Sequence, residues 1–390
     1  MTATLTTPAA EAAAELPRVR PLAVTALGVV SPAGIGLDAL AEALRGDRTP
    51  CSDAAQLPLG DADADGLPEA VRIVPDFRIA DHVGRKGTRH LDRTTALGLA
   101  ATAVLRSAAG VADGDPEWAA TGVVLGSTSG SVRSSSEFAR DTHVQERPYL
   151  VDAARFPNTV MNSVTGQAAI WHGLRGINAT LSGGTTASLA AFRYARNALA
   201  QGHARRLLVG GVEELCPQTA WAWVATGALA PEVPIGEGCA LFALEDAERA
   251  RAAGTPVLAE VLACETSFAP VGQRPGLSGG LAECVNRALA RGGVDASEIS
   301  LVAPGGTGLS VLEGAERRAL TRVLAGRAVE QVRVKDVTGE AYSADGALQL
   351  AAVLAHWRDT PADSRRVALV TGLGHDGNVG CLVVREGDGL

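Results

Sequence analysis

The stretch that decides the fold runs from Arg175 to Ser188 and reads Arg-Gly-Ile-Asn-Ala-Thr-Leu-Ser-Gly-Gly-Thr-Thr-Ala-Ser. Residues 178–182 are predicted to form a strand, and the small residues after them predict a tight turn into a helix that continues past Arg196. Such a turn aims one side chain at the positive end of a helix dipole. A cysteine in that place would have a lowered pKa and would act as a nucleophile.

Outward from this stretch, short apolar runs alternate with longer helical patterns. Each apolar run ends in Gly or a small polar residue and is therefore predicted to be a buried strand. These runs lie at residues 22–25, 122–125, 207–209 and 367–370. Ala- and Leu-rich segments with helical spacing lie at residues 37–44, 94–109, 188–200, 281–291, 313–324 and 348–357. The alternation of strands and helices predicts a layered α/β architecture.

The chain has 390 residues, which is enough for two or three compact cores. An Ala/Gly break at residues 251–255 follows a charged helical segment, and a new strand is predicted near Val257. We therefore expect a flexible tail over residues 1–20, an N-terminal half over 21–254 and a C-terminal half over 255–390. The segments 50–70 and 141–160 are predicted to be loops.

Charge and cysteine content argue against several classes of function. The net charge of -8 disfavours nucleic acid or an anionic membrane as a partner. The six cysteines include no Cys-x-x-Cys pair and show no metal-ligand spacing, so we expect buried thiols in a reducing, cytoplasmic compartment, with no metal and no cofactor. The first 20 residues resemble neither a signal peptide nor a membrane span.

The 175–188 stretch resembles the nucleophile elbow of β-ketoacyl synthases, in which a cysteine follows two small residues. Other segments resemble motifs of that family in the same order, at residues 24–32, 89–93, 157–162, 173–176, 210–213, 236–238, 335–339 and 374–378. The resemblance covers residues 21–387. It implies a thiolase-like α/β fold of two similar βαβαβ halves in α/β/α/β/α layers, assembled as a dimer.

The catalytic residues that the resemblance calls for are missing. The family's cysteine position falls on Thr185, its two histidine positions fall on Pro304 and Glu340, and only the lysine of the second motif is retained, as Lys335. An alcohol is a far weaker acid than a thiol, whose pKa is about 8.5, and needs an adjacent base to attack. Losing one oxyanion donor alone typically costs about 10²–10³ in rate. We therefore expect no catalytic residue and negligible condensation by this chain.

Residues 339–343, Gly-Glu-Ala-Tyr-Ser, narrow the resemblance to chain-length factors, the non-catalytic partners in bacterial type II polyketide synthases. Chain-length factors often have Gln and Arg where this chain has Thr185 and Glu340. The resemblance implies a heterodimer with an active ketosynthase, in which this subunit forms part of the elongation tunnel and limits the length of a polyketide or polyene on acyl carrier protein. Lys86 and Arg89 match family positions that contact the carrier.

The tunnel positions carry mostly small side chains, which predicts a deep tunnel and a long product. The residues expected at the tunnel or the partner interface are Val132, Ser134, Ser135, Ser136, Met161 and His375. Simpler interpretations stay open: Thr185 as a filler of the turn, Glu340 as a solvated or ion-paired residue near the interface, His375 as a structural histidine, and residues 85–90 as a solvated helix start. Two other functions also stay open, a stand-alone enzyme that uses Thr185, His375 and Glu340, and a homodimeric carrier-binding scaffold.

Overall fold

The computed structural model describes residues 18–52, 57, 67–68, 71–230, 232–270, 276–306 and 308–390. Most of the predicted 50–70 loop and residues 1–17 of the expected tail lie outside the described residues. Within the rest of that tail, the Val19 amide donates to the Arg291 carbonyl at 3.0 Å, and the Val19 side chain packs against the core of the C-terminal half.

The N-terminal half contains five strands in the order β5-β4-β6-β8-β1. Their bounds are β1 Leu22–Ser31, β4 Gly122–Gly126, β5 Asn178–Leu181, β6 Arg206–Glu213 and β8 Gly238–Asp246. Three helices pack on this half-sheet, α3 Arg93–Ala108, α6 Ser163–His172 and α7 Ala187–Ala200. The predicted strands and the predicted helices 94–109 and 188–200 lie on these elements, although β1 continues six residues beyond the predicted strand, and the predicted helix 37–44 lies on α1 Leu37–Arg45.

The C-terminal half repeats the same arrangement with β11-β10-β12-β13-β9. Its strands are β9 Ala259–Phe268, β10 Ile299–Ala303, β11 Glu330–Gln331, β12 Val367–Leu373 and β13 Asn378–Glu386, and its large helices are α10 Gly276–Gly292, α11 Ser310–Val323 and α13 Asp345–Asp359. Parallel and antiparallel pairs occur at equivalent places in both halves. The two halves are therefore copies of one topology.

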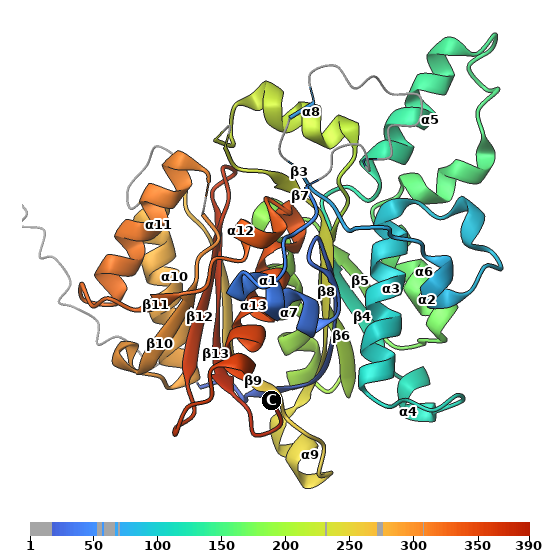
Figure 1. Cartoon of the computed structure of the whole chain (residues 1–390). Coiled ribbons are helices and arrows are strands. Elements are labelled where there is room, and N and C mark those ends of the chain that lie inside the picture. The colour runs from blue at the N-terminus through green and yellow to red at the C-terminus, as the bar shows by residue number, and fades with distance from the viewer. Residues whose placement is uncertain are drawn as a thin grey trace, which may run out of the picture.

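The two half-sheets join through antiparallel pairing of β1 with β9, and the short strand β2 (Gly34–Ile35), which pairs with β1, completes an 11-stranded sheet. Figure 1 shows α7 and α13 between the two half-sheets, with α3 and α6 outside one and α10 and α11 outside the other. Separate apolar cores fill the spaces between these layers. The predicted α/β/α/β/α layering is confirmed.

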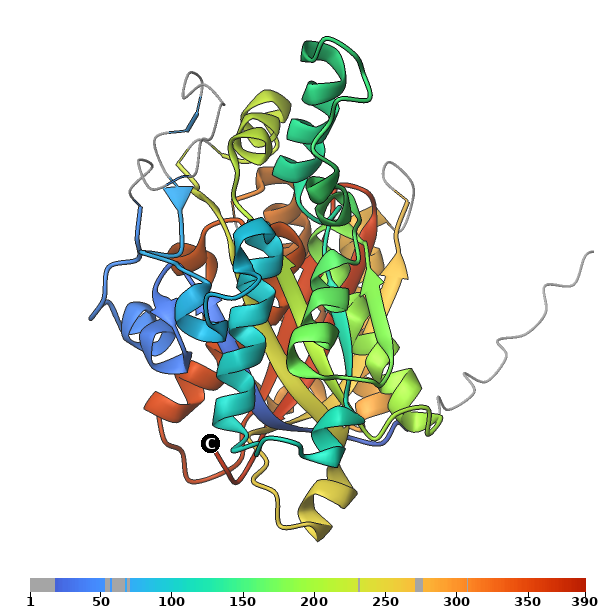
Figure 2. The same cartoon turned by 90° about the vertical axis from the view of Figure 1, so that its right-hand side faces the viewer.

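The smaller elements lie around this sandwich. They are β2 Gly34–Ile35, α1 Leu37–Arg45, β3 Val71–Arg72, α2 Ala80–Val83, α4 Pro116–Ala119, α5 Val132–Val144, α8 Pro217–Thr226, β7 Ile235–Gly236, α9 Ala247–Ala252 and α12 Lys335–Thr338. Helix α5 stands above the body in both views (Figures 1 and 2). The prediction of a loop over 141–160 is partly wrong, because α5 continues to Val144 and a 3-10 helix covers Ala153–Thr159 with Asp152 as its cap.

Candidate functional site

Thr185 lies at the predicted elbow, in a 3-10 turn that leads from β5 into α7. The preceding Gly184 has φ 54°, a left-handed conformation that glycine adopts without strain. Thr185 is buried, with 6% of its surface exposed. Its hydroxyl donates to the Leu373 carbonyl oxygen at 2.8 Å. Its proton is therefore directed to a main-chain acceptor, which is not a base that could activate the oxygen.

A cavity of about 470 Å³ opens beside Thr185. Val132 and His375, both expected at the tunnel, line this cavity together with Thr185. Its other walls come from α8, from the start of α13 and from the loop between β12 and β13, and include Gln218, Ala222, Trp223, Ala228, Tyr342 and Asp376. The mostly apolar wall suits an acyl or polyketide segment better than a highly charged ligand.

The sequence predicts no role at this site for three residues that line the cavity, Trp223, Tyr342 and Glu213. Trp223 and Tyr342 meet edge to face with ring centroids 5.4 Å apart, and Tyr342 has φ 43°, a strained value for an aromatic residue. Burial raises the pKa of Glu213 to about 7, although Ser343 and Thr128 donate to its carboxylate. Glu213 and Tyr342 belong to motifs quoted above, whereas nothing in the sequence singles out Trp223.

Lys335, the retained lysine, lies in a buried ionic cluster with Glu340 and Asp345. Its Nζ donates to Glu340 Oε2 at 2.6 Å and to the Gly305 carbonyl oxygen at 2.6 Å. The same Nζ forms an ion pair with Asp345 Oδ2 at 2.8 Å. Glu340 is therefore buried and ion-paired, not solvated, and it also accepts from the Tyr342 amide at 3.2 Å.

The charges of this cluster do not balance, because one ammonium group faces two carboxyl groups. Burial alone would lower the pKa of Lys335, but Asp345 and Glu340 together raise it above its usual value. Burial, followed by the nearby Glu340, raises the pKa of Asp345 well above that of an exposed carboxyl group. The cluster thus holds Lys335 firmly as a cation, and the raised pKa of Asp345 favours the protonated form of that one carboxyl group.

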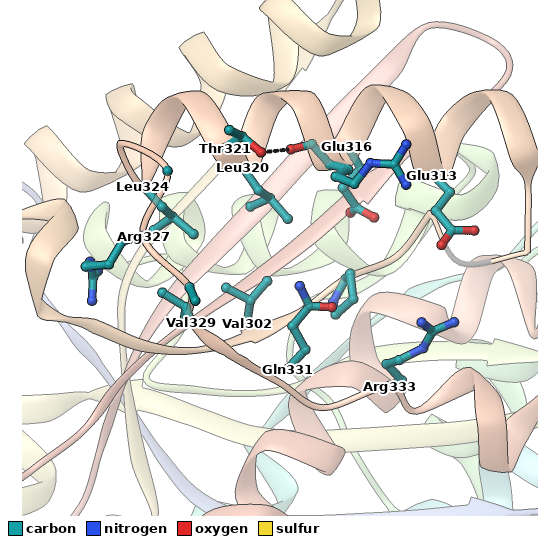
Figure 3. A pocket seen from close by; sticks show the side chains of 14 residues that line it. Val302, Glu313, Glu316, Leu320, Thr321, Leu324, Arg327, Val329, Gln331 and Arg333 are labelled. Carbon is teal, nitrogen blue, oxygen red and sulfur yellow. Dashed lines mark hydrogen bonds between the residues drawn. The ribbon is translucent and has the colours of Figure 1, made fainter.

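Pro304 lies apart from the Thr185 cavity and lines a different one of about 310 Å³ between α11 and the β10–β11 edge (Figure 3). Glu316 closes the inner wall of that cavity and accepts from the amides of Gly305 and Gly306 at 3.0 and 2.8 Å. A histidine at position 304 would present an imidazole on this chain segment. Proline presents neither a donor nor an acceptor, so the segment only supplies the Gly305 carbonyl oxygen to Lys335.

The remaining tunnel candidates do not gather at the Thr185 cavity. Ser134 lines a second cavity, of about 340 Å³, between α5 and the start of α3. Ser135 and Ser136 lie half-buried on α5, and Met161 is exposed before α6. Only Val132 of the α5 residues borders the space beside Thr185.

The two expected carrier contacts are both exposed. Lys86 lies in the turn after α2, and Arg89 lies in a 3-10 turn over Thr88–His90. Arg89 also borders the Ser134 cavity, together with Arg93, Arg133 and Arg155. Arg93 pairs with Glu237, and Arg133 and Arg155 share Glu137.

Other sites are not evident in the part of the chain that the structure describes. There, no three or more His, Cys, Asp or Glu side chains are placed to hold a metal ion. All six cysteines are free, and only Cys51 is more than slightly exposed. No described helix has the length and apolar character needed to cross a membrane.

Two family models match nearly the whole chain. The N-terminal domain of β-ketoacyl synthase matches residues 19–258, and the C-terminal domain of β-ketoacyl synthase matches residues 258–360. The chain belongs to the β-ketoacyl synthase family. The thiolase-like fold predicted from the sequence is therefore confirmed.

Among solved structures, the ishigamide ketosynthase/chain length factor is 36% identical, covers 94% of this chain and 99% of its own, and superposes with a TM-score of 0.79. Curated relatives are more distant. The tetracenomycin polyketide synthase ketoacyl synthase beta subunit of Streptomyces glaucescens is 29% identical over 54% of this chain and 56% of its own. The 3-oxoacyl-acyl-carrier-protein synthase 2 of Rhizobium meliloti is 27% identical over 85% of each chain.

Proposed function

We propose that this β-ketoacyl synthase homologue is a non-catalytic chain-length factor, which pairs with an active ketosynthase to form the elongation tunnel. One observation carries the proposal: each position that a ketosynthase needs for chemistry holds a residue that cannot perform it. Thr185 donates to a carbonyl oxygen, Pro304 has no polar side chain, and Glu340 is held by Lys335. Condensation must then take place in the partner.

The stand-alone alternative requires Thr185, His375 and Glu340 to meet. Thr185 and His375 do border one cavity, but Glu340 is absent from its lining and is engaged with Lys335 and the Tyr342 amide. With the Thr185 hydroxyl donating to the Leu373 carbonyl oxygen, neither the carboxylate nor the imidazole is its acceptor. This arrangement disfavours acyl transfer or dehydration by the chain alone.

A partner subunit has a suitable surface on which to bind. β5 is the terminal strand of its half-sheet, so its outer edge is free to pair with another strand. Exposed apolar side chains lie on the neighbouring elements, among them Ile170 on α6, Tyr194 on α7 and Phe268 at the end of β9. A free edge flanked by aromatic residues is typical of an association surface.

The carrier protein and the growing chain complete the proposal. We infer that Lys86 and Arg89 offer exposed positive charge to the acidic carrier, which docks mainly on the ketosynthase partner. Small residues on α5, such as Ser135, then leave volume at the tunnel wall. The name of the 36% identical structure, a ketosynthase/chain length factor, supports such a pairing.

The decisive experiment compares the purified chain with and without a co-expressed ketosynthase that has the intact Cys-His-His set. We expect the chain alone to form no condensation product and to carry no acyl group after incubation with acyl and malonyl carrier protein. The complex of both subunits should elongate the acyl substrate. Peptide mass spectrometry should find the acyl group only on the ketosynthase cysteine. An acyl group on Thr185 in the absence of a partner would overturn the proposal, and a carrier-binding homodimer that ignores the ketosynthase would favour the scaffold alternative.

The tunnel-wall role has a test of its own. Ser135→Phe should shift the product distribution of the complex toward shorter chains, because the added ring removes tunnel volume. Ser135→Ala is the matched control and should leave the distribution unchanged. Product lengths are read by liquid chromatography and mass spectrometry, and identical distributions for Phe and wild type would remove Ser135 from the wall.

A further inference from the structure

The C-terminal part of β9, residues 262–268, is a second free strand edge, on the same side of the molecule as β5 (Figure 2). β1 pairs with β9 only at Ala259, Glu260 and Val261, so among the described residues this part of β9 has one neighbouring strand, β13. Helix α7 packs between the two edges, since it contacts β4, β5 and β6 on one side and β9 on the other. The edge of β5, the outer residues of α7 and the free edge of β9 therefore form one continuous face.

Four arginines line the β9 end of this face. From α7, Arg193 donates to the Thr266 carbonyl oxygen at 3.1 Å and Arg196 donates to the Cys264 carbonyl oxygen at 2.8 Å. From α10, Arg287 donates to Glu265 at 3.2 Å and Arg291 donates to Glu265 at 2.8 Å. We call Arg193, Arg196, Arg287 and Arg291 the arginine strip.

The arginine strip has more positive charge than its surroundings neutralise. Within the described residues, the buried Glu265 pairs with Arg196, Arg287 and Arg291, whereas Arg193 donates only to Thr266. One carboxylate therefore faces four arginines, and three positive charges remain. Arg196 is buried, but the side chains of Arg287 and Arg291 are 33% and 25% exposed. Guanidinium groups in such partly exposed positions bind carboxylates through two parallel hydrogen bonds.

A second copy of this chain offers little to match that charge. β5, α6 and α7, which make up the rest of the face, contain no Asp or Glu. A homodimer built on the β5 edge would therefore bring unmatched arginines from both copies to the interface, without a carboxylate from these elements. Tyr194 and Phe268, 40% and 62% exposed, add the aromatic surface that suits a protein partner.

We propose that the arginine strip receives carboxylate side chains of the ketosynthase partner and thereby selects that partner over a second copy of this chain. This inference rests on the proposed function, because it specifies the chemistry of the surface that the partner must present. The partner should place at least one Asp or Glu opposite Arg193 and Arg287. Such matched charges raise specificity and association rate more than they raise affinity.

The test uses the complex of this chain with its co-purifying ketosynthase. Arg193→Glu together with Arg287→Glu should weaken heterodimer affinity by about 100-fold or more at low salt, because two attractive pairs become repulsive. Raising the NaCl concentration should weaken the wild-type complex and reduce the difference in affinity between wild type and the double Glu variant. Arg365→Glu, at an exposed position near the C-terminus, is the control and should bind as wild type does.

Folding and charge are separated by two milder double variants. Arg193→Lys with Arg287→Lys keeps the charge and should keep the salt dependence, whereas Arg193→Gln with Arg287→Gln should lose most of it. The Gln variant should also self-associate more than wild type in analytical ultracentrifugation. Unchanged affinity and salt dependence in the Gln variant would refute the inference and leave the proposed function standing, while a wild-type chain that binds no ketosynthase would refute the proposed function itself.

Discussion

The two halves of the molecule have the same strand order, yet they differ at the place where each central helix begins. In the N-terminal half, α7 begins after Gly184 and Thr185, next to an open, mostly apolar cavity. In the C-terminal half, α13 begins beside Lys335, Glu340 and Asp345, which are packed as a buried ionic cluster. The same topology thus places an open cavity at the start of α7 and a closely packed ionic cluster at the start of α13.

The two helix starts therefore differ in how their side chains are held. At α7 the Thr185 hydroxyl donates to a main-chain carbonyl oxygen, and an open cavity lies beside it. At α13 the Lys335 ammonium group pairs with Glu340 and Asp345 inside the protein. The second arrangement makes the site part of the framework, because removing one partner of a buried ion pair leaves an uncompensated charge.

The largest effect is expected from Lys335→Met. Without the ammonium group, Glu340 and Asp345 remain buried with no cation, and the free energy of unfolding should fall by about 3–5 kcal/mol. Urea unfolding followed by circular dichroism gives the value. Lys86→Met, at an exposed lysine, should change stability by less than about 0.5 kcal/mol. A loss of less than about 0.5 kcal/mol in the free energy of unfolding of Lys335→Met would show that the Lys335 cluster does not stabilise the fold.

A pH-dependent effect of intermediate size is expected from Glu213→Gln. Burial raises the folded-state pKa of Glu213 to about 7, above its unfolded value of about 4.3, so the folded state binds the extra proton. The stability from Glu213 is thus fully present below pH of about 4.3 and is lost as pH rises toward about 7. In Glu213→Gln, the fall in the free energy of unfolding between these pH values should be smaller than in wild type by up to about 3 kcal/mol.

Unfolding free energies of wild type and Glu213→Gln, measured across this pH range, test the sign directly. Glu248→Gln, at an exposed position on α9, should follow the wild-type curve throughout. Parallel curves for Glu213→Gln and wild type would mean that the Glu213 carboxyl group is ionised in the folded protein at all of these values. Glu214, whose pKa burial also raises to about 7, should contribute a further decline of the same sign in both proteins.

The smallest effect is expected from Thr185→Ala. The change removes one hydroxyl that donates to the Leu373 carbonyl oxygen, which should cost about 1 kcal/mol. Thr185→Ser keeps the donor and should lie within about 0.5 kcal/mol of wild type. Thermal unfolding of the three proteins resolves this order, and equal stability of Ala and Ser would mean that the hydroxyl bond contributes nothing.

The sequence was informative where the relevant signal is local. Runs of apolar residues place the strands, and the small residues at 182–186 place the turn into α7, because backbone geometry is determined by nearby residue types. The resemblance also implied that Thr185, Pro304 and Glu340 stand at the family's catalytic positions, and that assignment stays a prediction. The sequence left Glu340 open as a solvated or an ion-paired residue, and the structure shows it buried and paired with Lys335.

Contacts between distant segments were harder to anticipate. Pro304 lines a cavity under α11 and not the space beside Thr185, because the turn at Gly305 and Gly306 is fixed by Glu316. Trp223 reaches Tyr342 from a helix more than a hundred residues earlier, which is a matter of packing and not of local pattern. The α5 serines face different surroundings from Val132, because successive helical residues point in different directions.

The pairing of β1 with β8 and β9 also constrains how the polypeptide matures. During synthesis β1 leaves the ribosome first, yet the residues that flank it in the sheet, Gly238–Asp246 and Ala259–Val261, follow more than 200 positions later. Contacts so far apart in the chain form slowly. Until β8 has been made, β1 has only the short β2 as a strand partner, and its pairing with β9 in the C-terminal half forms later still.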